Sequence, residues 1–147
     1  MIKVMKFGGT SLGSVDAMER TASIIGRDGA KKIVVVSAMS GVTNSLIGCI
    51  RDRPPIEGVL ASLRDRYSSS AKMIMSPPLF AEYGEALDSS LDDLRIVLNA
   101  RWKVAADPLL DDAISSWGER LSSLTMAYVL RSRGVDSVPL TSEKAGI

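Results

Sequence analysis

The hydrophobic pattern begins with two short strands, each followed by a helix. Ile2–Phe7 is a mainly apolar run that contains Lys3 and Lys6, Ile33–Val36 is a continuous β-branched run, and a loop of small residues follows each one. In the second run, apolarity without alternation is typical of a strand covered on both faces, as in a parallel sheet. Helices are expected from Ser14 to about Arg27 and from the second loop to about Asp52. Alternating strands and helices predict an α/β fold.

The rest of the pattern is mainly helical. Two amphipathic helices are expected over residues 57–75 and 79–105, separated by Ser76-Pro77-Pro78. The apolar stripe of the first consists of Val59, Leu60, Leu63, Tyr67 and Ala71. Their charged residues predict a solvated face, and we assign them no chemistry. Asp107-Pro108 starts a further helix, with Asp as the cap and Pro at the first helical position, and Gly134 ends it.

The last part of the chain predicts an incomplete fold. Residues 135–140 have the composition of a third strand. The chain then stops after a short polar segment, without the helix that a βαβ series would next require.

One acidic residue in the helix over 107–134 has two open interpretations. Its apolar stripe recurs at spacings of three and four, through Leu110, Ile114, Trp117, Leu121, Leu124 and Tyr128. Glu119 lies roughly opposite this stripe, together with Ser115, Ser122 and Met126. It is either a solvent-facing carboxylate or, beside a Gly118 that lets a ligand approach, a partner for a cationic group on that ligand.

The loop after the first strand has the features of an anion site. Lys6 stands one residue before the end of the apolar run, and Gly8 and Gly9 follow it. Glycines allow positive φ and close approach of a ligand, and a helix N-terminus favours negative charge. The alternative is a tight βα turn without a ligand. A second small-residue loop, 37–44, favours the ligand, because loops at the carboxyl ends of parallel strands can face one pocket.

Composition removes several classes of function. The 147 residues include 18 basic and 17 acidic side chains, so the net charge of +1 predicts no attraction to nucleic acid or membranes. The chain has no histidine, which excludes Ser-His-Asp and Cys-His catalysis and the commonest zinc ligand. The single Cys49 is expected to pack in the core. No signal sequence or membrane span is present, so we expect a cytoplasmic protein.

Three segments together resemble the aspartate kinases of the amino-acid kinase superfamily. They are Lys6-Phe7-Gly8-Gly9-Thr10-Ser11, Val35–Asn44 and Ser116–Ser122, and their order and spacing agree along nearly the whole chain. The resemblance implies a three-layer αβα fold with a mainly parallel sheet, of which residues 1–147 form the N-terminal, amino-acid-binding lobe. It also implies phosphorylation of the L-aspartate β-carboxylate by ATP with Mg²⁺, the first step toward lysine, threonine and methionine.

The resemblance also assigns residue roles. Lys6 would bridge the transferring phosphoryl group and be the catalytic residue, and Glu119 would bind the amino group of aspartate. Gly8, Gly9 and Thr10 would line the phosphate path, and Ser37 and Thr43 would contact substrate. The full set of expected substrate- and phosphate-binding residues is Lys6, Phe7, Gly8, Gly9, Thr10, Ser11, Ser37, Ala38, Ser40, Gly41, Thr43 and Glu119. No metal ligand is assigned to this chain.

The chain departs from the family by its length. The nucleotide-binding lobe and the regulatory ACT domains of aspartate kinases have no counterpart here, so ATP and Mg²⁺ are expected to bind mainly to the missing lobe. We therefore expect little activity from this chain alone, and either a homo-oligomer or pairing with a chain that carries the nucleotide lobe. The alternatives are a non-catalytic binding or assembly module and a related kinase that acts on a different acceptor.

Overall fold

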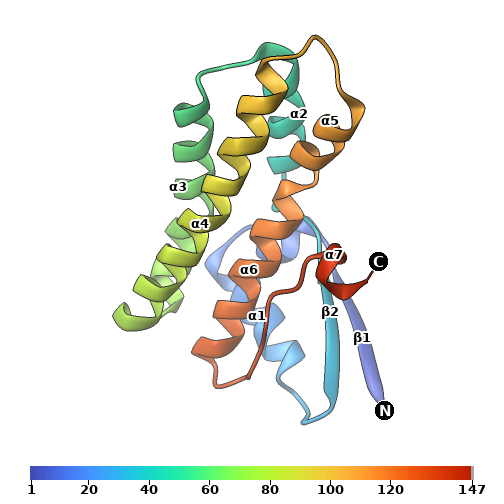
Figure 1. Cartoon of the computed structure of the whole chain (residues 1–147). Coiled ribbons are helices and arrows are strands. Elements are labelled where there is room, and N and C mark those ends of the chain that lie inside the picture. Colours follow the sequence, from blue (N-terminus) through green and yellow to red (C-terminus); the bar gives the residue numbers. More distant parts are fainter. Residues whose placement is uncertain (147) are drawn as a thin grey trace.

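A computed structural model of the chain describes residues 1–146. In Figure 1 the two strands lie along one side of the molecule with α1 and α6 next to them, and α3 and α4 lie farther away. The elements in order are β1 (Ile2–Phe7), the 3₁₀ helix η1 (Gly9–Leu12), α1 (Val15–Ile25), β2 (Lys31–Val36), α2 (Val42–Asp52), α3 (Ile56–Ile74), α4 (Pro77–Trp102), α5 (Pro108–Ser115), α6 (Trp117–Ser132) and α7 (Ser142–Ala145).

The two strands form a parallel pair, as the pattern predicted. Their register runs from Ile2 opposite Lys31 to Phe7 opposite Val36. One face of the pair, which includes Val36, packs into the core. The opposite face is exposed: the exposed fractions of Ile2, Val4, Ile33 and Val35 are 61%, 69%, 54% and 46%.

Burial of the strands on both faces is therefore not found within residues 1–146. The apolar composition is that of a two-faced strand, but the described residues place helices on one face only. The α/β arrangement is present with one helical layer, and the open face of the sheet is defined by Ile2, Val4, Ile33 and Val35.

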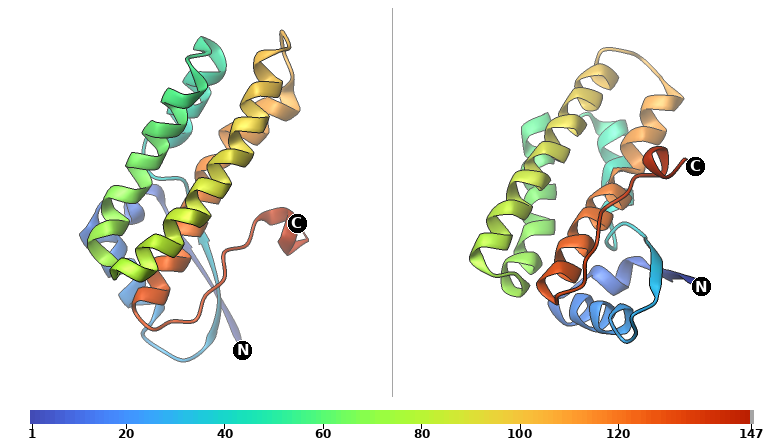
Figure 2. Two further views of the ribbon diagram at one scale, coloured as in Figure 1. Left: turned by 60° about the vertical axis from the view of Figure 1, so that its left-hand side comes forward. Right: turned by 60° about the horizontal axis from the view of Figure 1, so that its bottom comes forward.

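The helices supply most of the core. Helix α4 packs against α3, α5 and α6, and α6 also contacts α1, α3 and β2. Figure 2 shows α3 and α4 lying lengthwise beside each other. The predicted stripe of α3 is confirmed, because all its members are buried: Val59, Leu60, Leu63, Tyr67 and Ala71. The charged side chains of this helix pair form exposed ion pairs, such as Arg64 with Asp88, on the expected solvated face.

Local capping signals are confirmed at three helix ends. The Ser14 hydroxyl accepts a hydrogen bond from the Ala17 amide at the start of α1. Asp107 accepts from two amides of the first turn of α5. Gly134, with φ of 75°, follows α6, and the next amide, that of Val135, returns to the Leu130 carbonyl in the pattern of a Schellman motif.

Two predictions about the C-terminal part are wrong. The single helix expected over 107–134 is divided at Ser116 into α5 and α6. Residues 135–140 form no strand, and side chains of the segment and of α6 hold it instead: the Ser137 hydroxyl donates to the Ala127 carbonyl at 2.7 Å, and Arg131 donates to the Ser137 carbonyl at 3.0 Å. A strand needs a neighbour, and this segment pairs with neither strand of the sheet.

The core position of α4 generates a stability prediction. Leu94 is fully buried and Ile96, two residues along the same helix, is mostly exposed. We expect Leu94→Ala to lower the free energy of unfolding by about 3 kcal/mol, because it removes buried methyl groups and leaves a cavity. The matched variant Ile96→Ala is expected to change it by less than about 0.5 kcal/mol. Urea unfolding followed by circular dichroism measures both values, and equal losses would contradict this assignment of the core.

Candidate functional site

The loops after the two strands leave the sheet at the same edge and touch each other. Phe7 and Val36 are partners in the last row of the sheet, and the Ser37 amide donates to the Phe7 carbonyl at 3.1 Å. A Cβ atom on Gly9 would lie 2.5 Å from the Ala38 carbonyl oxygen and 3.2 Å from the Ser40 nitrogen. Only glycine fits here, because the two backbones are in direct contact.

The glycines of the first loop act differently from what was expected. Positive φ, expected at Gly8 and Gly9, is found at neither residue. Gly9 is needed for its contact with Ala38, whereas a Cβ on Gly8 would meet nothing within 4 Å. The loop contains a turn of 3₁₀ helix, in which the Ser11 amide donates to the Gly8 carbonyl at 3.0 Å. The amide of Ser11 is therefore engaged within the loop.

In the second loop, positive φ occurs at Gly41. This residue has φ of 84° and immediately precedes α2. A residue with a side chain rarely adopts this conformation, so the turn into α2 depends on glycine. Ala38 on this loop is buried, Ser37 and Thr43 are half-buried, and Ser40 is exposed.

The break at Ser116 brings a third segment to the two loops. It places Gly118 and Glu119 in the first turn of α6. A Cβ atom on Gly118 would lie 2.5 Å from the Ala38 Cβ and 3.0 Å from Val42 Cγ1, so α6 packs directly on the second loop. Glu119, the next residue, is exposed at this junction.

The surroundings of Glu119 differ from a solvent-facing helix surface. Ser122 and Met126, which the helical period places on the same face, are buried. Glu119 is thus an exposed carboxylate at the end of a buried face. A purely solvated surface would have exposed all three residues.

Lys6 occupies the carboxyl end of β1. It is exposed and pairs in register with Val35, which lies on the open face of the sheet two residues before Ser37. Its position is therefore at the edge from which both loops leave. Phe7, the next residue, packs partly against the core. The structure brings the loops of Gly9 and Ala38 together with Gly118. Glu119 is the exposed residue next to Gly118, and Lys6 is exposed at the end of β1, three residues before Gly9.

Sequence reasoning missed two residues of α3 that hold these segments. The Tyr67 hydroxyl donates to the Gly118 carbonyl at 2.9 Å, and Arg66 donates to the Ser40 carbonyl at 3.0 Å. Tyr67 was expected only as a member of the apolar stripe. The available signal was that a buried tyrosine hydroxyl usually needs a hydrogen-bond partner, which a stripe of leucines does not offer.

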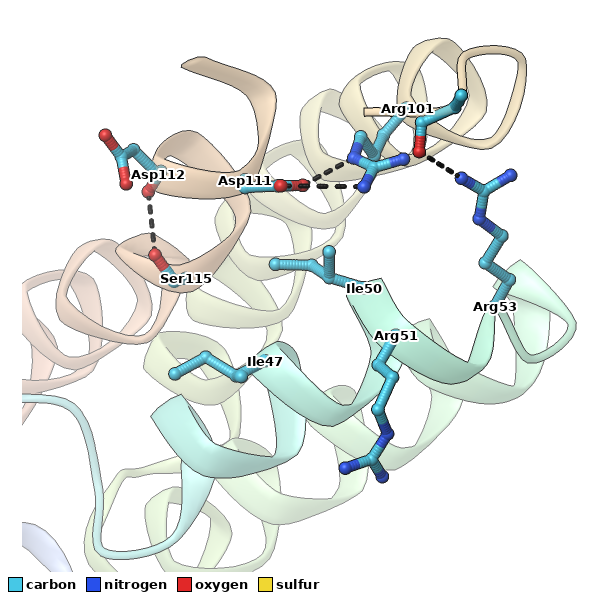
Figure 3. Close-up of a pocket in the computed structure, with 9 residues that line it drawn as sticks. Ile47, Ile50, Arg51, Arg53, Arg101, Asp111, Asp112 and Ser115 are labelled. Carbon is cyan, nitrogen blue, oxygen red and sulfur yellow. Dashed lines mark hydrogen bonds and ion pairs between the residues drawn. The ribbon is translucent and has the colours of Figure 1, made fainter. Parts of the chain in front are cut away.

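A separate hollow of about 530 Å³ lies between the second half of α2 and helix α5. Its arginines are engaged by the protein itself, as Figure 3 shows for Arg101 with Asp111. Arg53 donates to the Val104 and Ala105 carbonyls, at 2.8 and 3.0 Å, and so ties α2 to the end of α4. No predicted site residue lines this hollow. Arg53 and Arg101 in its lining connect neighbouring helices to one another.

Other reactive groups lie outside the candidate site. Cys49 packs partly against the core, and burial raises the pKa of its thiol, which keeps the group protonated and a poor nucleophile. Within residues 1–146 no three His, Cys, Asp or Glu side chains are grouped as metal ligands. None of the helices in this part of the chain is long and apolar enough to cross a membrane.

Comparison with known proteins places the chain in a family. The model of the amino acid kinase family matches residues 1–147. The chain belongs to the amino acid kinase family. Lysine-sensitive aspartokinase 3 of Escherichia coli (strain K12) is 33% identical over 138 residues, which are 92% of this chain and 30% of that protein.

Solved structures agree with this assignment to the amino acid kinase family. The structure of E. coli aspartokinase III in complex with lysine and aspartate matches with a TM-score of 0.75 at 32% identity, over 92% of this chain and 30% of that one. The structure with aspartate and ADP matches with a TM-score of 0.74 at 32% identity, over 91% and 30%. The expected amino-acid kinase-like fold and the resemblance to aspartate kinases are confirmed, over the N-terminal part of the catalytic domain.

The contact at Ala38 can be tested by adding a single methyl group. Gly118→Ala is expected to lower the free energy of unfolding by about 1–3 kcal/mol, because the new Cβ would overlap Ala38. Gly84→Ala is the matched control: Gly84 lies inside α4 with no atom within 4 Å of its Cβ position. That variant is expected to gain up to about 1 kcal/mol from helix propensity. Thermal or urea unfolding measures both, and a stabilised Gly118→Ala would contradict the close packing.

Proposed function

We propose that this chain forms the aspartate-binding lobe of an aspartate kinase, which transfers the γ-phosphoryl group of ATP to the β-carboxylate of L-aspartate. The observation that carries the proposal is the contact of three segments at Ala38, which sets the exposed Lys6 and Glu119 beside two loops of glycine and hydroxyl residues. A relative that is 33% identical supports it, because its solved structures contain aspartate.

The residue roles follow from charge and position. Lys6 contributes positive charge to the transferring phosphoryl group, and Gly8, Gly9 and Thr10 line its path. Ser37 and Thr43 contact the substrate from the second loop. The carboxylate of Glu119 pairs with the ammonium group of aspartate. Phe7, Ser11, Ala38, Ser40 and Gly41 complete the walls of the site.

This chemistry suits a chain without histidine. The β-carboxylate of aspartate is ionised at neutral pH, so it attacks the γ-phosphorus without a general base. One P–O bond to the ADP leaving group breaks as one P–O bond to the carboxylate forms. Catalysis then consists of alignment and of neutralising the charge on the transferring group, to which a lysine and backbone amides contribute.

ATP enters the proposal as a substrate together with its Mg²⁺ ion. We assign no Mg²⁺ ligand to this chain and expect the ion to bind mainly to the nucleotide-binding lobe. The chain spans 30% of the length of the E. coli aspartokinase that it matches. A nucleotide-binding lobe, on the same or another polypeptide, completes the enzyme. We call this complete enzyme the assembled kinase. Its place is in cytoplasmic synthesis of lysine, threonine and methionine.

A second candidate function is a non-catalytic assembly module. The open face of the sheet favours it, because Ile2, Val4, Ile33 and Val35 expose apolar surface that a partner would cover. A kinase that acts on a different carboxylate or phosphate acceptor differs from our proposal only in the substrate. An acceptor panel with radiolabelled ATP separates that kinase from an aspartate kinase.

The two exposed charges give the first functional prediction. In the assembled kinase, Lys6→Ala is expected to lower kcat by about 10²–10³, the usual loss when one stabilising charge or donor is removed from a transition state. Lys31→Ala is the control, since Lys31 lies on the same face of the sheet at the opposite end of β2. Steady-state kinetics with L-aspartate and MgATP measure both variants.

Glu119 tests the substrate side of the site. Glu119→Gln is expected to raise the KM for aspartate by at least about tenfold, because the ammonium group loses its charged partner, with little change in the KM for ATP. Glu85→Gln, on the exposed surface of α4, should leave both constants unchanged. Unaltered kinetics in both Lys6→Ala and Glu119→Gln would show that the site is assigned wrongly.

The proposal that aspartate and nucleotide bind to different lobes gives a further prediction. We expect the isolated chain to form no aspartyl phosphate above background, because the groups that bind the nucleotide lie on the second lobe. A coupled assay for ADP with aspartate and MgATP measures this, and addition of the nucleotide-binding lobe should restore turnover. Normal turnover from the isolated chain would contradict the assignment of separate lobes.

A further inference from the structure

Two consecutive residues of α3 reach two different walls of the candidate site. The Tyr67 hydroxyl donates to the Gly118 carbonyl at 2.9 Å and lies 3.2 Å from Ser122 Oγ, both in α6. Arg66 donates to the Ser40 carbonyl, in the loop between β2 and α2, at 3.0 Å. Helix α3 therefore fixes both segments that flank Ala38, although it carries none of the residues assigned to the substrate.

The Tyr67 bond is formed by a fully buried group in its donor form. Tyr67 has an exposed fraction of 0%. Desolvation raises the pKa of its phenol, and the negative charge of Glu119 acts in the same direction. The hydroxyl therefore stays protonated at neutral pH. Because its single hydrogen is directed to Gly118, the Ser122 hydroxyl acts as the donor in the second bond.

The hydrogen bond from Tyr67 is made to the first turn of α6. The α6 helix starts directly after the break at Ser116, and Glu119 lies in its first turn. Contacts from other elements hold this turn in place. Gly118 packs on Ala38, and the Tyr67 hydroxyl donates to the Gly118 carbonyl. The Trp117 indole N–H donates to Ser90 Oγ at 3.3 Å, and Arg120 also pairs with Glu143. Among these contacts, the Tyr67 bond is made to the residue directly before Glu119.

We propose that Tyr67 is a positioning residue for Glu119: its hydroxyl holds the Gly118 carbonyl and so fixes the first turn of α6 relative to the loop after β2. The inference rests on the proposed function, because it assumes that Glu119 binds the ammonium group of aspartate. It assigns Tyr67 no contact with substrate. Its effect passes through Glu119 alone.

The chain offers a closely matched control on the neighbouring helix, with a hydroxyl that also bonds to α6. Tyr83 of α4 is also fully buried, and its hydroxyl lies 2.9 Å from Thr125 Oγ1 in α6. Thr125 donates in turn to the Leu121 carbonyl, so Tyr83 is the donor to Thr125, and the Tyr67 carbonyl lies 3.4 Å from the Tyr83 hydroxyl as a second, longer acceptor. Tyr67→Phe and Tyr83→Phe thus each remove one buried hydroxyl that binds α6. Of these two hydroxyls, only that of Tyr67 bonds to the turn of α6 that carries Glu119.

The experiment compares these variants in the assembled kinase at a temperature where both are folded by circular dichroism. Tyr67→Phe is expected to raise the KM for aspartate by about fivefold, the equivalent of one hydrogen bond, with the KM for ATP unchanged. Tyr83→Phe should leave both constants within about twofold. In a Glu119→Gln background, Tyr67→Phe should cause no further rise, because an effect that passes through Glu119 is lost with it.

The outcomes separate this inference from the proposed function. If Glu119→Gln leaves the KM for aspartate unchanged, the role proposed for Glu119 is wrong, and the positioning role is lost with it. If Glu119→Gln raises this KM but Tyr67→Phe does not, only the positioning role is overturned. An equal rise in Tyr83→Phe, or a full additional rise in the double variant, would also overturn it, because either result indicates a general structural effect.

Discussion

The close contact of three backbone segments at Ala38 determines the geometry of the candidate site. Gly9 and Gly118 approach Ala38 so closely that a Cβ atom at either position would lie 2.5 Å from one of its atoms. Close-packed interiors do not yield to such overlaps without shifting the backbone. The loop after β1, the loop after β2 and the start of α6 are therefore positioned together. The exposed Lys6 and Glu119 each lie a few residues from one of these contacts.

Helices α3 and α4 bury apolar surface and also fix the orientation of α6. Leucines bury area but do not specify one rotation of α6 about its axis. The hydroxyls of Tyr67 and Tyr83 do, because each needs a particular oxygen on α6: the Gly118 carbonyl or Thr125 Oγ1. Buried polar groups that are fully paired make an arrangement specific, since any other rotation would leave them unpaired. The α3–α4 pair thus fixes the orientation of α6 through these two hydroxyls.

Local patterns in the sequence predicted the features that depend on neighbouring residues. The two strands, the cap at Ser14 and the stripe of α3 follow from period and propensity, and parallel pairing follows from the β-α-β order. The break at Ser116, the unpaired segment 135–140 and the partner of Tyr67 depend on distant residues, which no local pattern contains. The small-residue loops predicted that the two loops meet, but the function of Gly9 in that contact appeared only in the structure.

Under the proposed function, residues 1–146 supply one side of the site through two exposed charges. Lys6 belongs to the open face of the sheet, and Glu119 ends a helix face whose other members, Ser122 and Met126, are buried. Both side chains are exposed. Under the proposed function, a positive and a negative side chain suit a ligand that carries both an ammonium group and acidic groups. Under the same proposal, the second lobe brings the nucleotide to this ligand.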